Sequence, residues 1–332
     1  METRKVQVTG GSTYTVSIPK GWATENDVSA GTVIEFHPEG DSLLLSPQRD
    51  QERSEGTLDI SELYGRDLAR AVVTMYVSGF DIIRLETNKM AAAQRRSIRD
   101  ATQALVGLEV VEETGSHILL HDLLDSAELS IHSAITRMRL IALTMLADAA
   151  QSVIENDDDL ADDVVERDDD VDRLWFMVSR VFRSVLRDPS VAAEIGLPRE
   201  TCFDYHSSAR QLERVADHAA KIATLSLDLG PVPEPVCEAL ATLHEDATAV
   251  VEMAMDALLE TDSDAATRLA NEAREAVHGI DDHTRSVDDL IRSLDDALEA
   301  QLLGLIVDSL SRTADYGGNI AETALQKAAP SP

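Results

Sequence analysis

The sequence has few lysines, few aromatic residues and only two cysteines. Five of its 332 residues are lysine, and Phe, Trp and Tyr together make up 4%. Cys202 and Cys237 lie far apart and lack the short spacing of metal-binding pairs, so we expect a reduced, cytoplasmic protein. No stretch approaches the roughly 18 consecutive apolar residues of a membrane helix, and no apolar run follows a basic start. We therefore expect neither a membrane span nor a signal peptide.

Positive charge is also scarce. There are 29 Lys and Arg residues against 61 Asp and Glu residues, which gives a net charge of −32. High salt screens the self-repulsion of such a chain, so we expect a salt-accumulating cytoplasm of the haloarchaeal type. An acidic interaction surface is the alternative explanation. In either case the acidity disfavours nonspecific binding to nucleic-acid backbones or anionic lipid.

The hydrophobic residues that are present favour helix packing. They make up 44% of the chain and are mostly Ala, Leu, Val and Ile. The length is enough for two or three domains. The common motifs of phosphate-binding loops, nucleophile elbows, zinc proteases and dithiol redox sites are missing, so we expect a protein that is not an enzyme.

Residues 1–50 show the alternating pattern of short strands. The expected strands are Lys5–Thr9, Tyr14–Ile18, Thr32–His37 and Ser42–Ser46, with a helical turn from Lys20 to Asn26. Fifty residues with four short strands have too small a core to be stable alone, so we expect a homodimer.

This segment resembles the swapped-hairpin domain of the AbrB and MazE type. The residues that carry the resemblance are Gly11–Trp22 followed by Val28–Ile34. The resemblance implies that two chains interleave their hairpins into one barrel, which commonly binds DNA. The candidate phosphate contacts are Arg4, Lys5 and Lys20, with hydroxyl contacts from Ser12 and Thr13. The alternative is a hairpin that only joins two chains.

Residues 51–121 are expected to form a small α+β linker domain. The pattern predicts helices at Leu58–Ser78 and Met90–Leu105 and strands at Phe80–Glu86, Leu108–Glu113 and His117–His121. The second helix carries Arg95, Arg96 and Arg99, a basic cluster that we interpret as a solvated face. Nothing in this region indicates a chemical function.

Residues 122–328 follow a helical pattern almost throughout. Turn signals divide them into six helices of roughly 25–35 residues, and Gly230–Pro235 separates the helices three and three. The fold class is therefore mainly α, with an N-terminal swapped-hairpin barrel, a small α+β domain and two tandem antiparallel three-helix bundles, at residues 122–229 and 233–328. The segment Leu212–Ala223 recurs 98 residues later as Leu310–Ala321, which indicates a duplicated unit.

The duplicated segment resembles the motif of PhoU, the regulator of phosphate uptake. Both copies read Leu-x-Arg-x-Ala-Asp and end in Ile-Ala. The resemblance implies tandem three-helix repeats that dock on partners such as a phosphate transporter's ATPase. It also implies surface metal sites formed by acidic pairs.

Acidic residues at i and i+4 lie on one helix face and could hold a divalent cation or an iron cluster. The candidate ligands in the first repeat are Glu166, Asp170, Glu213 and Asp217, and those in the second are Asp308 and Asp315. In the second repeat Ser311 replaces the expected acid, with His278 and Asp282 as a substitute pair. The alternative is ordinary acidic surface, since residues 155–172 hold eleven acidic residues and one basic residue.

Other residues of the motif have structural interpretations. We expect core positions at Val215, Ala216, Ala219, Ile222 and Ala223. His206 and His218 are expected in packing or at the surface. Arg214 and Arg312 are expected to pair with neighbouring acids.

Together these patterns predict a regulator of phosphate homeostasis that binds DNA through its N-terminal segment. Three alternatives stay open: an adaptor that does not bind DNA and docks on transporter proteins, a metal-binding helical bundle unrelated to phosphate, and an antitoxin. The 280 residues after the hairpin segment argue against the antitoxin.

Overall fold

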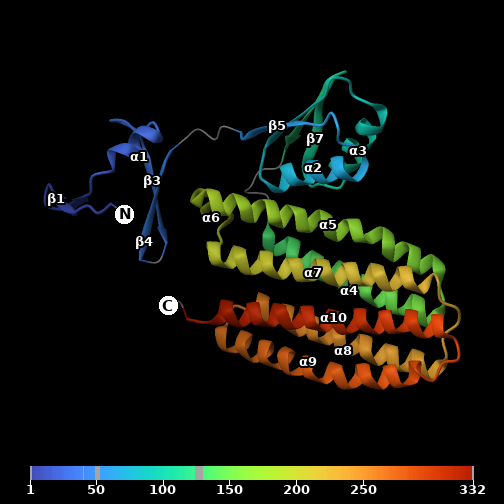
Figure 1. Ribbon diagram of the computed structural model, residues 1–332. Coiled ribbons are helices and arrows are strands. Elements are labelled where there is room, and N and C mark those ends of the chain that lie inside the picture. Colours follow the sequence, from blue (N-terminus) through green and yellow to red (C-terminus); the bar gives the residue numbers. More distant parts are fainter. Residues whose placement is uncertain (1, 40, 49–52, 124–129, 331–332) are drawn as a thin grey trace. The chain divides into compact units, whose positions relative to one another are not determined.

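A computed structural model describes residues 2–39, 41–48, 53–123 and 130–330 of the chain (Figure 1). The contacts divide the chain into two compact units, residues 1–53 and residues 54–332. None of the helices within the described ranges combines the length and the hydropathy that a membrane crossing requires.

The first unit consists of two antiparallel hairpins and a short helix. Strand β1 (Gln7–Thr9) pairs with β2 (Thr13–Thr15), and β3 (Ile34–Glu39) pairs with β4 (Ser42–Pro47). Helix α1 (Lys20–Glu25) lies between them in sequence. Strands β1 and β2 are shorter than the expected Lys5–Thr9 and Tyr14–Ile18.

The hairpins leave large apolar side chains exposed. Tyr14 is 77% exposed and Phe36 is 60% exposed, and Val8, Val16 and Leu43 are also more than half exposed. Within residues 2–39 and 41–48 the two sheets do not join into a barrel. The interleaved barrel needs a second chain and stays a prediction.

The second unit begins with a four-stranded sheet of order β5-β6-β8-β7. Strands β5 (Glu55–Asp59) and β6 (Ile82–Glu86) are parallel, and β8 (His117–Asp122) is antiparallel to both β6 and β7 (Leu108–Glu113). Helices α2 (Gly65–Val77) and α3 (Ala92–Gln103) pack on this sheet over Leu68, Val72, Ile83, Leu85 and Ile98. A parallel pair requires a crossover connection, and α2 supplies it.

The expected helix Leu58–Ser78 is wrong over residues 58–64. Its first part belongs to β5, and the helix starts at Gly65. The strand forms because it pairs with β6, 27 positions along the chain, which local patterning does not report. At Gly56 a Cβ would lie 2.5 Å from the Cε atom of Met75 and 2.8 Å from the ring of Phe80, so a larger residue would force these side chains to shift.

Six long helices follow, as the pattern predicted. They are α4 (Ile131–Glu155), α5 (Asp158–Arg187), α7 (Arg199–Ser226), α8 (Glu234–Leu259), α9 (Ser263–Ile291) and α10 (Ala297–Ala328). A short helix, α6 (Pro189–Ile195), lies in the connection before α7. Several helices begin at an aspartate whose carboxylate accepts main-chain N–H bonds, which places part of the acidic composition in caps: Asp157, Asp188, Asp262 and Asp296.

The six helices share one continuous core. Helices α4, α5 and α7 pack on one another, as do α8, α9 and α10, and α7 also packs along α10 (Figure 1). The two copies of the motif therefore lie on neighbouring helices. The five core positions predicted on α7 are all fully buried.

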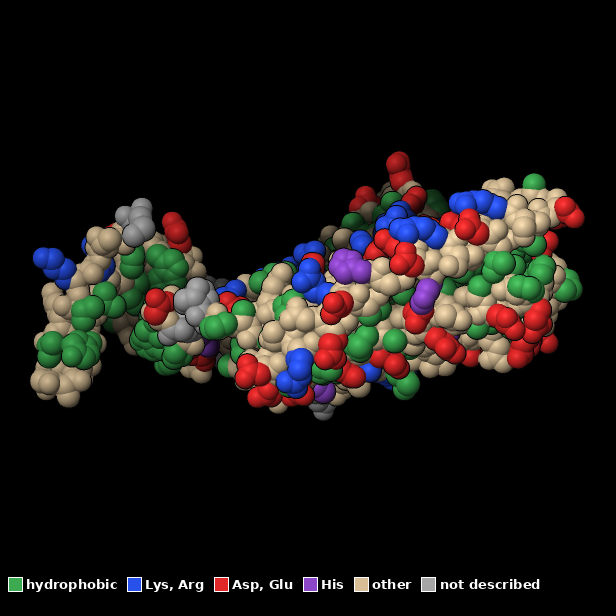
Figure 2. Space-filling view, turned by 90° about the horizontal axis from the view of Figure 1, so that it is seen from below, with side chains coloured by type: hydrophobic (Ala, Val, Ile, Leu, Met, Phe, Trp, Pro, Cys, Tyr) green, Lys and Arg blue, Asp and Glu red, His purple; other side chains and the backbone are tan. Residues whose placement is uncertain are grey.

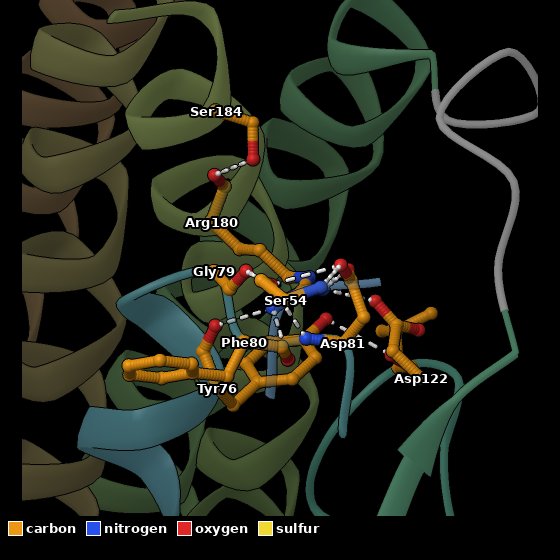
Figure 3. Close-up of polar contacts among 9 residues, drawn as sticks. Ser54, Tyr76, Gly79, Phe80, Asp81, Asp122, Arg180 and Ser184 are labelled. Carbon is orange, nitrogen blue, oxygen red and sulfur yellow. Dashed lines mark hydrogen bonds and ion pairs between the residues drawn. The ribbon is translucent and has the colours of Figure 1, made fainter. Parts of the chain in front are cut away.

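An arginine joins the sheet region to the helices. Arg180, buried on α5, donates hydrogen bonds to the main-chain oxygens of Tyr76 (2.7 Å) and Phe80 (3.0 Å). It also forms ion pairs with Asp81 (2.9 Å) and Asp122 (2.7 Å) (Figure 3). The sheet region and the helices accordingly form one compact unit.

Candidate functional site

Four carboxylates from two helices gather beside the motif of the first repeat. Glu213 and Asp217 come from α7, and Asp168 and Asp172 come from α5. Each pair has i, i+4 spacing, which places both members on one helix face. Glu213 is only 7% exposed.

The carboxylates are held in an unfavourable electrostatic environment. Burial, together with the charge of Asp217, raises the pKa of Glu213 to about 7 and the pKa values of Asp168 and Asp172 to about 6. Arg210 offsets part of this effect, since its guanidinium donates to the Oε1 atom of Glu213 at 2.5 Å. Among the described residues the buried Oε2 atom of Glu213 has no hydrogen-bond partner. Such a cluster favours a bound cation or retained protons.

The structure brings together only some of the residues predicted for this site. Glu213 and Asp217 belong to the cluster, whereas Glu166 and Asp170 lie exposed on α5. The residues of α5 that meet Glu213 and Asp217 electrostatically are Asp168 and Asp172.

A signal for these two aspartates was present in the sequence. Asp168 lies four positions after Val164 and three before Val171, both fully buried, so it interrupts the apolar stripe of α5. An acid inside such a stripe faces a neighbouring helix. The positions of Glu166 and Asp170 are rotated away from it.

The donor set suits a hard divalent cation, because all the donors are carboxylate oxygens. Nevertheless, among the described residues no three His, Cys, Asp or Glu side chains converge as a coordination group. The placed side chains therefore do not form a ready metal site, and metal binding stays a prediction.

The second repeat does not gather its acids in the same way. Asp308 and Asp315 are exposed on α10 and lie 3.9 Å and 3.5 Å from nitrogens of Arg312. Asp282 pairs with Arg285 at 2.7 Å. The expectation that Arg312 pairs with neighbouring acids is confirmed.

Arg214 differs from that expectation. Among the described residues it forms no ion pair, and its guanidinium lies 5.6 Å from the centre of the Tyr316 ring. The motif residue of the first repeat thus reaches across to α10 and contacts an aromatic side chain of the second repeat.

The histidines of α7 pack as expected. The His206 ring stacks on Phe182, with ring centroids 4.5 Å apart, and lies 4.9 Å from Trp175. His218 forms a 3.2 Å hydrogen bond with the hydroxyl of Tyr316 on α10. These contacts tie α7 to α5 and to α10.

The candidate DNA contacts of the first unit all reach solvent. Arg4 and Lys5 precede β1, Ser12 lies in the β1–β2 turn, Thr13 begins β2, and Lys20 begins α1. Arg4 forms an ion pair with Glu2. Exposed cations and hydroxyls can contact phosphate oxygens, so the geometry allows the predicted role without testing it.

Comparisons with known proteins agree with both sequence resemblances. Residues 135–226 match the family model of the PhoU domain, and residues 7–53 match that of the antidote-toxin recognition MazE family of bacterial antitoxins. No curated protein matches the chain.

Two solved PhoU structures match part of the chain. The crystal structure of PhoU from Pseudomonas aeruginosa matches with a TM-score of 0.51 and 21% identity, over 59% of this chain and 93% of that chain. That of the phosphate transport system regulatory protein PhoU from Streptococcus pneumoniae gives a TM-score of 0.47 and 19% identity, over 59% and 91%. At 21% identity the first likeness shows a shared fold. The chain thus matches the PhoU domain over residues 135–226 and the MazE family over residues 7–53, and it shares the fold of PhoU from Pseudomonas aeruginosa.

Proposed function

We propose that this protein is a cytoplasmic regulator of phosphate homeostasis that binds DNA. The helical repeats sense or relay phosphate status, and the N-terminal hairpins contact DNA. The observation that carries the proposal is the presence on one chain of a PhoU domain and a MazE-like segment with exposed basic and hydroxyl side chains. Regulation then requires that the helical region have two states that couple differently to the hairpins.

The proposal includes a homodimer formed by the hairpins. Their exposed apolar side chains are clustered in a segment of about fifty residues, and a second copy would bury them. Light scattering of the full chain should give twice the mass of 36.1 kDa. Replacing Phe36 and Leu43 by Ser should yield the monomer mass, whereas replacing Leu140, exposed on α4, should not.

Chromatin immunoprecipitation tests the regulatory role. Occupancy of phosphate-transport promoters should change between phosphate-rich and phosphate-starved cells. The variant Arg4→Gln/Lys5→Gln/Lys20→Gln should lose this occupancy, because it removes the cations that are proposed to contact the phosphate oxygens of DNA. Absence of enrichment at any promoter would reject DNA binding.

An adaptor without DNA binding is the alternative. The same PhoU domain supports it, since the resemblance of the motif implies docking on a phosphate transporter's ATPase. Co-purification of transporter subunits, together with no gel shift of promoter DNA at multimolar salt, would favour the adaptor.

Metal binding at the first repeat is a second candidate. It is favoured by the raised pKa of Glu213 and its unpartnered Oε2 atom. Metal analysis of the purified chain should show a divalent or iron ion that is lost in Glu213→Gln/Asp217→Asn. Glu166→Gln/Asp170→Asn is the matched control, since those exposed acids lie outside the cluster. Equal metal content in all three proteins would remove this site.

A further inference from the structure

A hollow of about 510 Å³ on the second repeat gathers basic side chains in an otherwise acidic chain. It lies where α7, α9 and α10 meet, and its polar lining includes Arg214, Arg274, His278, Arg312, Tyr316 and Asn319. Asp315 and Glu322 also line it. Figure 2 views the α8–α9 side of the helical region and shows blue and purple side chains gathered along one edge, with acidic side chains among and below them.

The hollow occupies the place that the carboxylate cluster has in the first repeat. On the third helices the repeat offset of 98 residues places Ser311 opposite Glu213 and Arg312 opposite Arg214. On the second helices, aligning Glu166 with Glu272 places Arg274 opposite Asp168. The same alignment places His278 opposite Asp172.

Burial supports this alignment of the second helices. The buried residues Val164, Leu174 and Val181 of α5 fall opposite three residues of α9 that are also buried: Ala270, Ile280 and Val287. The two repeats therefore differ on their second helices, where Asp168 and Asp172 of the first repeat are replaced by Arg274 and His278 in the second. On the third helices Asp217 and Asp315 are acidic in both repeats.

The donors of the three arginines have no close acceptors. Arg274 lies 3.8 Å from Glu322, and Arg312 lies 3.5 Å from Asp315, both longer than the 2.7–2.9 Å of a good charge-assisted hydrogen bond. Arg214 lies over the ring of Tyr316, and its charge also acts on Glu213 and Asp217 without an ion pair to either carboxylate. Within the described part of the chain none of the three guanidinium groups makes a side-chain hydrogen bond.

We propose that this hollow binds a phosphate-class oxyanion, either inorganic phosphate or the phosphate group of a small metabolite. Guanidinium groups match the oxygens of such anions in pairs, and three of them, from α7, α9 and α10, line the hollow. The volume suits a small ligand, and the acidic surroundings repel nucleic acid.

The two carboxylates in the hollow set its selectivity. Binding requires Arg274 and Arg312 to exchange their loose pairing with Glu322 and Asp315 for the anion. A doubly charged oxyanion makes that exchange more favourable than chloride does, because it offers more charge and more acceptors. The idea that this site is where the helical repeats sense phosphate rests on the proposed function. The idea that the hollow binds an anion rests only on the residues that line it.

Calorimetric titration of the full chain with inorganic phosphate, in concentrated potassium chloride, tests the proposal. Arg274→Gln and Arg312→Gln should each weaken binding by about tenfold, since each removes a charged hydrogen-bond donor. Glu322→Gln should tighten binding, because it removes a competing carboxylate. These side chains are about half exposed, so the variants should fold normally, which circular dichroism checks.

Arg292→Gln is the matched control. It removes an arginine from the C-terminal end region of α9, where the side chain pairs with Asp289 outside the hollow. A parallel titration with glycerol phosphate distinguishes inorganic phosphate from the phosphate group of a metabolite. The ligand that binds more tightly is the class that the hollow prefers. No saturable binding of either ligand, or an equal loss in Arg292→Gln, would overturn the proposal. Binding that persists while promoter occupancy ignores phosphate would reject the regulatory function and leave the site intact.

Discussion

Single side chains on α5 and α7 place polar chemistry inside helical stripes that are otherwise apolar. His206 is a clear case, because its ring packs between Phe182 and Trp175. Burial, with the nearby Arg183 and Arg210 charges, lowers the pKa of His206 from 6.5 to about 4. Its neutral form is therefore the one that the fold accommodates.

The shift predicts a pH dependence of stability. The unfolded chain binds a proton at His206 below about pH 6.5, whereas the folded chain does so only below about pH 4. The folded state therefore loses stability as the pH falls through this window. His206→Phe keeps the ring and removes the titration, so the variant should gain about 1–2 kcal/mol relative to wild type between pH 7.5 and pH 5.

Denaturant titrations at constant salt measure this difference. The difference between the two proteins is the informative quantity, because Glu213 and Asp168, whose pKa values are raised, change the stability of both proteins in the opposite sense. If the stability difference between His206→Phe and wild type does not vary with pH, the lowered pKa of His206 is contradicted.

Arg180 is the second residue whose environment leads to a prediction. Its removal leaves Asp81 and Asp122 without the cation between them and takes one donor from the main-chain oxygens of Tyr76 and Phe80. Arg180→Met should cost about 3–5 kcal/mol in the free energy of unfolding, as expected for breaking a buried ion pair. Hydrogen exchange should also rise in α2 and β6. Arg187→Met, farther along α5, is the control. An equal loss of stability in both variants would contradict the proposed role of Arg180 in joining the sheet region to the helices.

At the scale of elements, helix contacts depend on small residues at close approach. Gly317 on α10 faces α8, and a Cβ there would lie 2.8 Å from Val250 and 3.0 Å from the main-chain nitrogen of Val251. Gly304, on the same helix, has open space in that direction. Close helix packing therefore explains the glycine at 317 but not the glycine at 304.

Alanine substitutions at the two positions should therefore have opposite effects on stability. Gly304→Ala should stabilise the chain by up to about 1 kcal/mol through helix propensity. Gly317→Ala should destabilise it by about 1–3 kcal/mol, because the methyl group overpacks the α8–α10 contact. Thermal unfolding of both variants measures the signs, and stabilisation by both would show that α8 and α10 are not in close contact.

Helix boundaries were largely predictable from the sequence, and strand β5 was not. Turn signals and a period of 3.6 residues are local, so they located the six long helices. The pairing of β5 with β6 is nonlocal, and the run that begins at Leu58 looks equally helical without it.

At the scale of the whole molecule, the net charge of −32 makes folding work against self-repulsion. The midpoint of thermal unfolding should therefore rise with potassium chloride. Most of the increase should come below about 1 M, where the Debye length falls from about 10 Å at 0.1 M to about 3 Å. A midpoint that stays constant over this range, from about 0.1 M to about 1 M potassium chloride, would contradict a fold adapted to salt.

The sequence by itself determined the local and the repeated features of this protein. The helices, the duplicated motif, the core face of α7 and the acidic composition all follow from residue type and spacing. The tertiary structure alone decided which acids meet, since Asp168 and Asp172 face α7 while Glu166 and Asp170 do not. It also decided that arginines from three helices line one hollow. The reason is physical: the rotation of one helix against another is determined by packing along its whole length, which no short segment encodes.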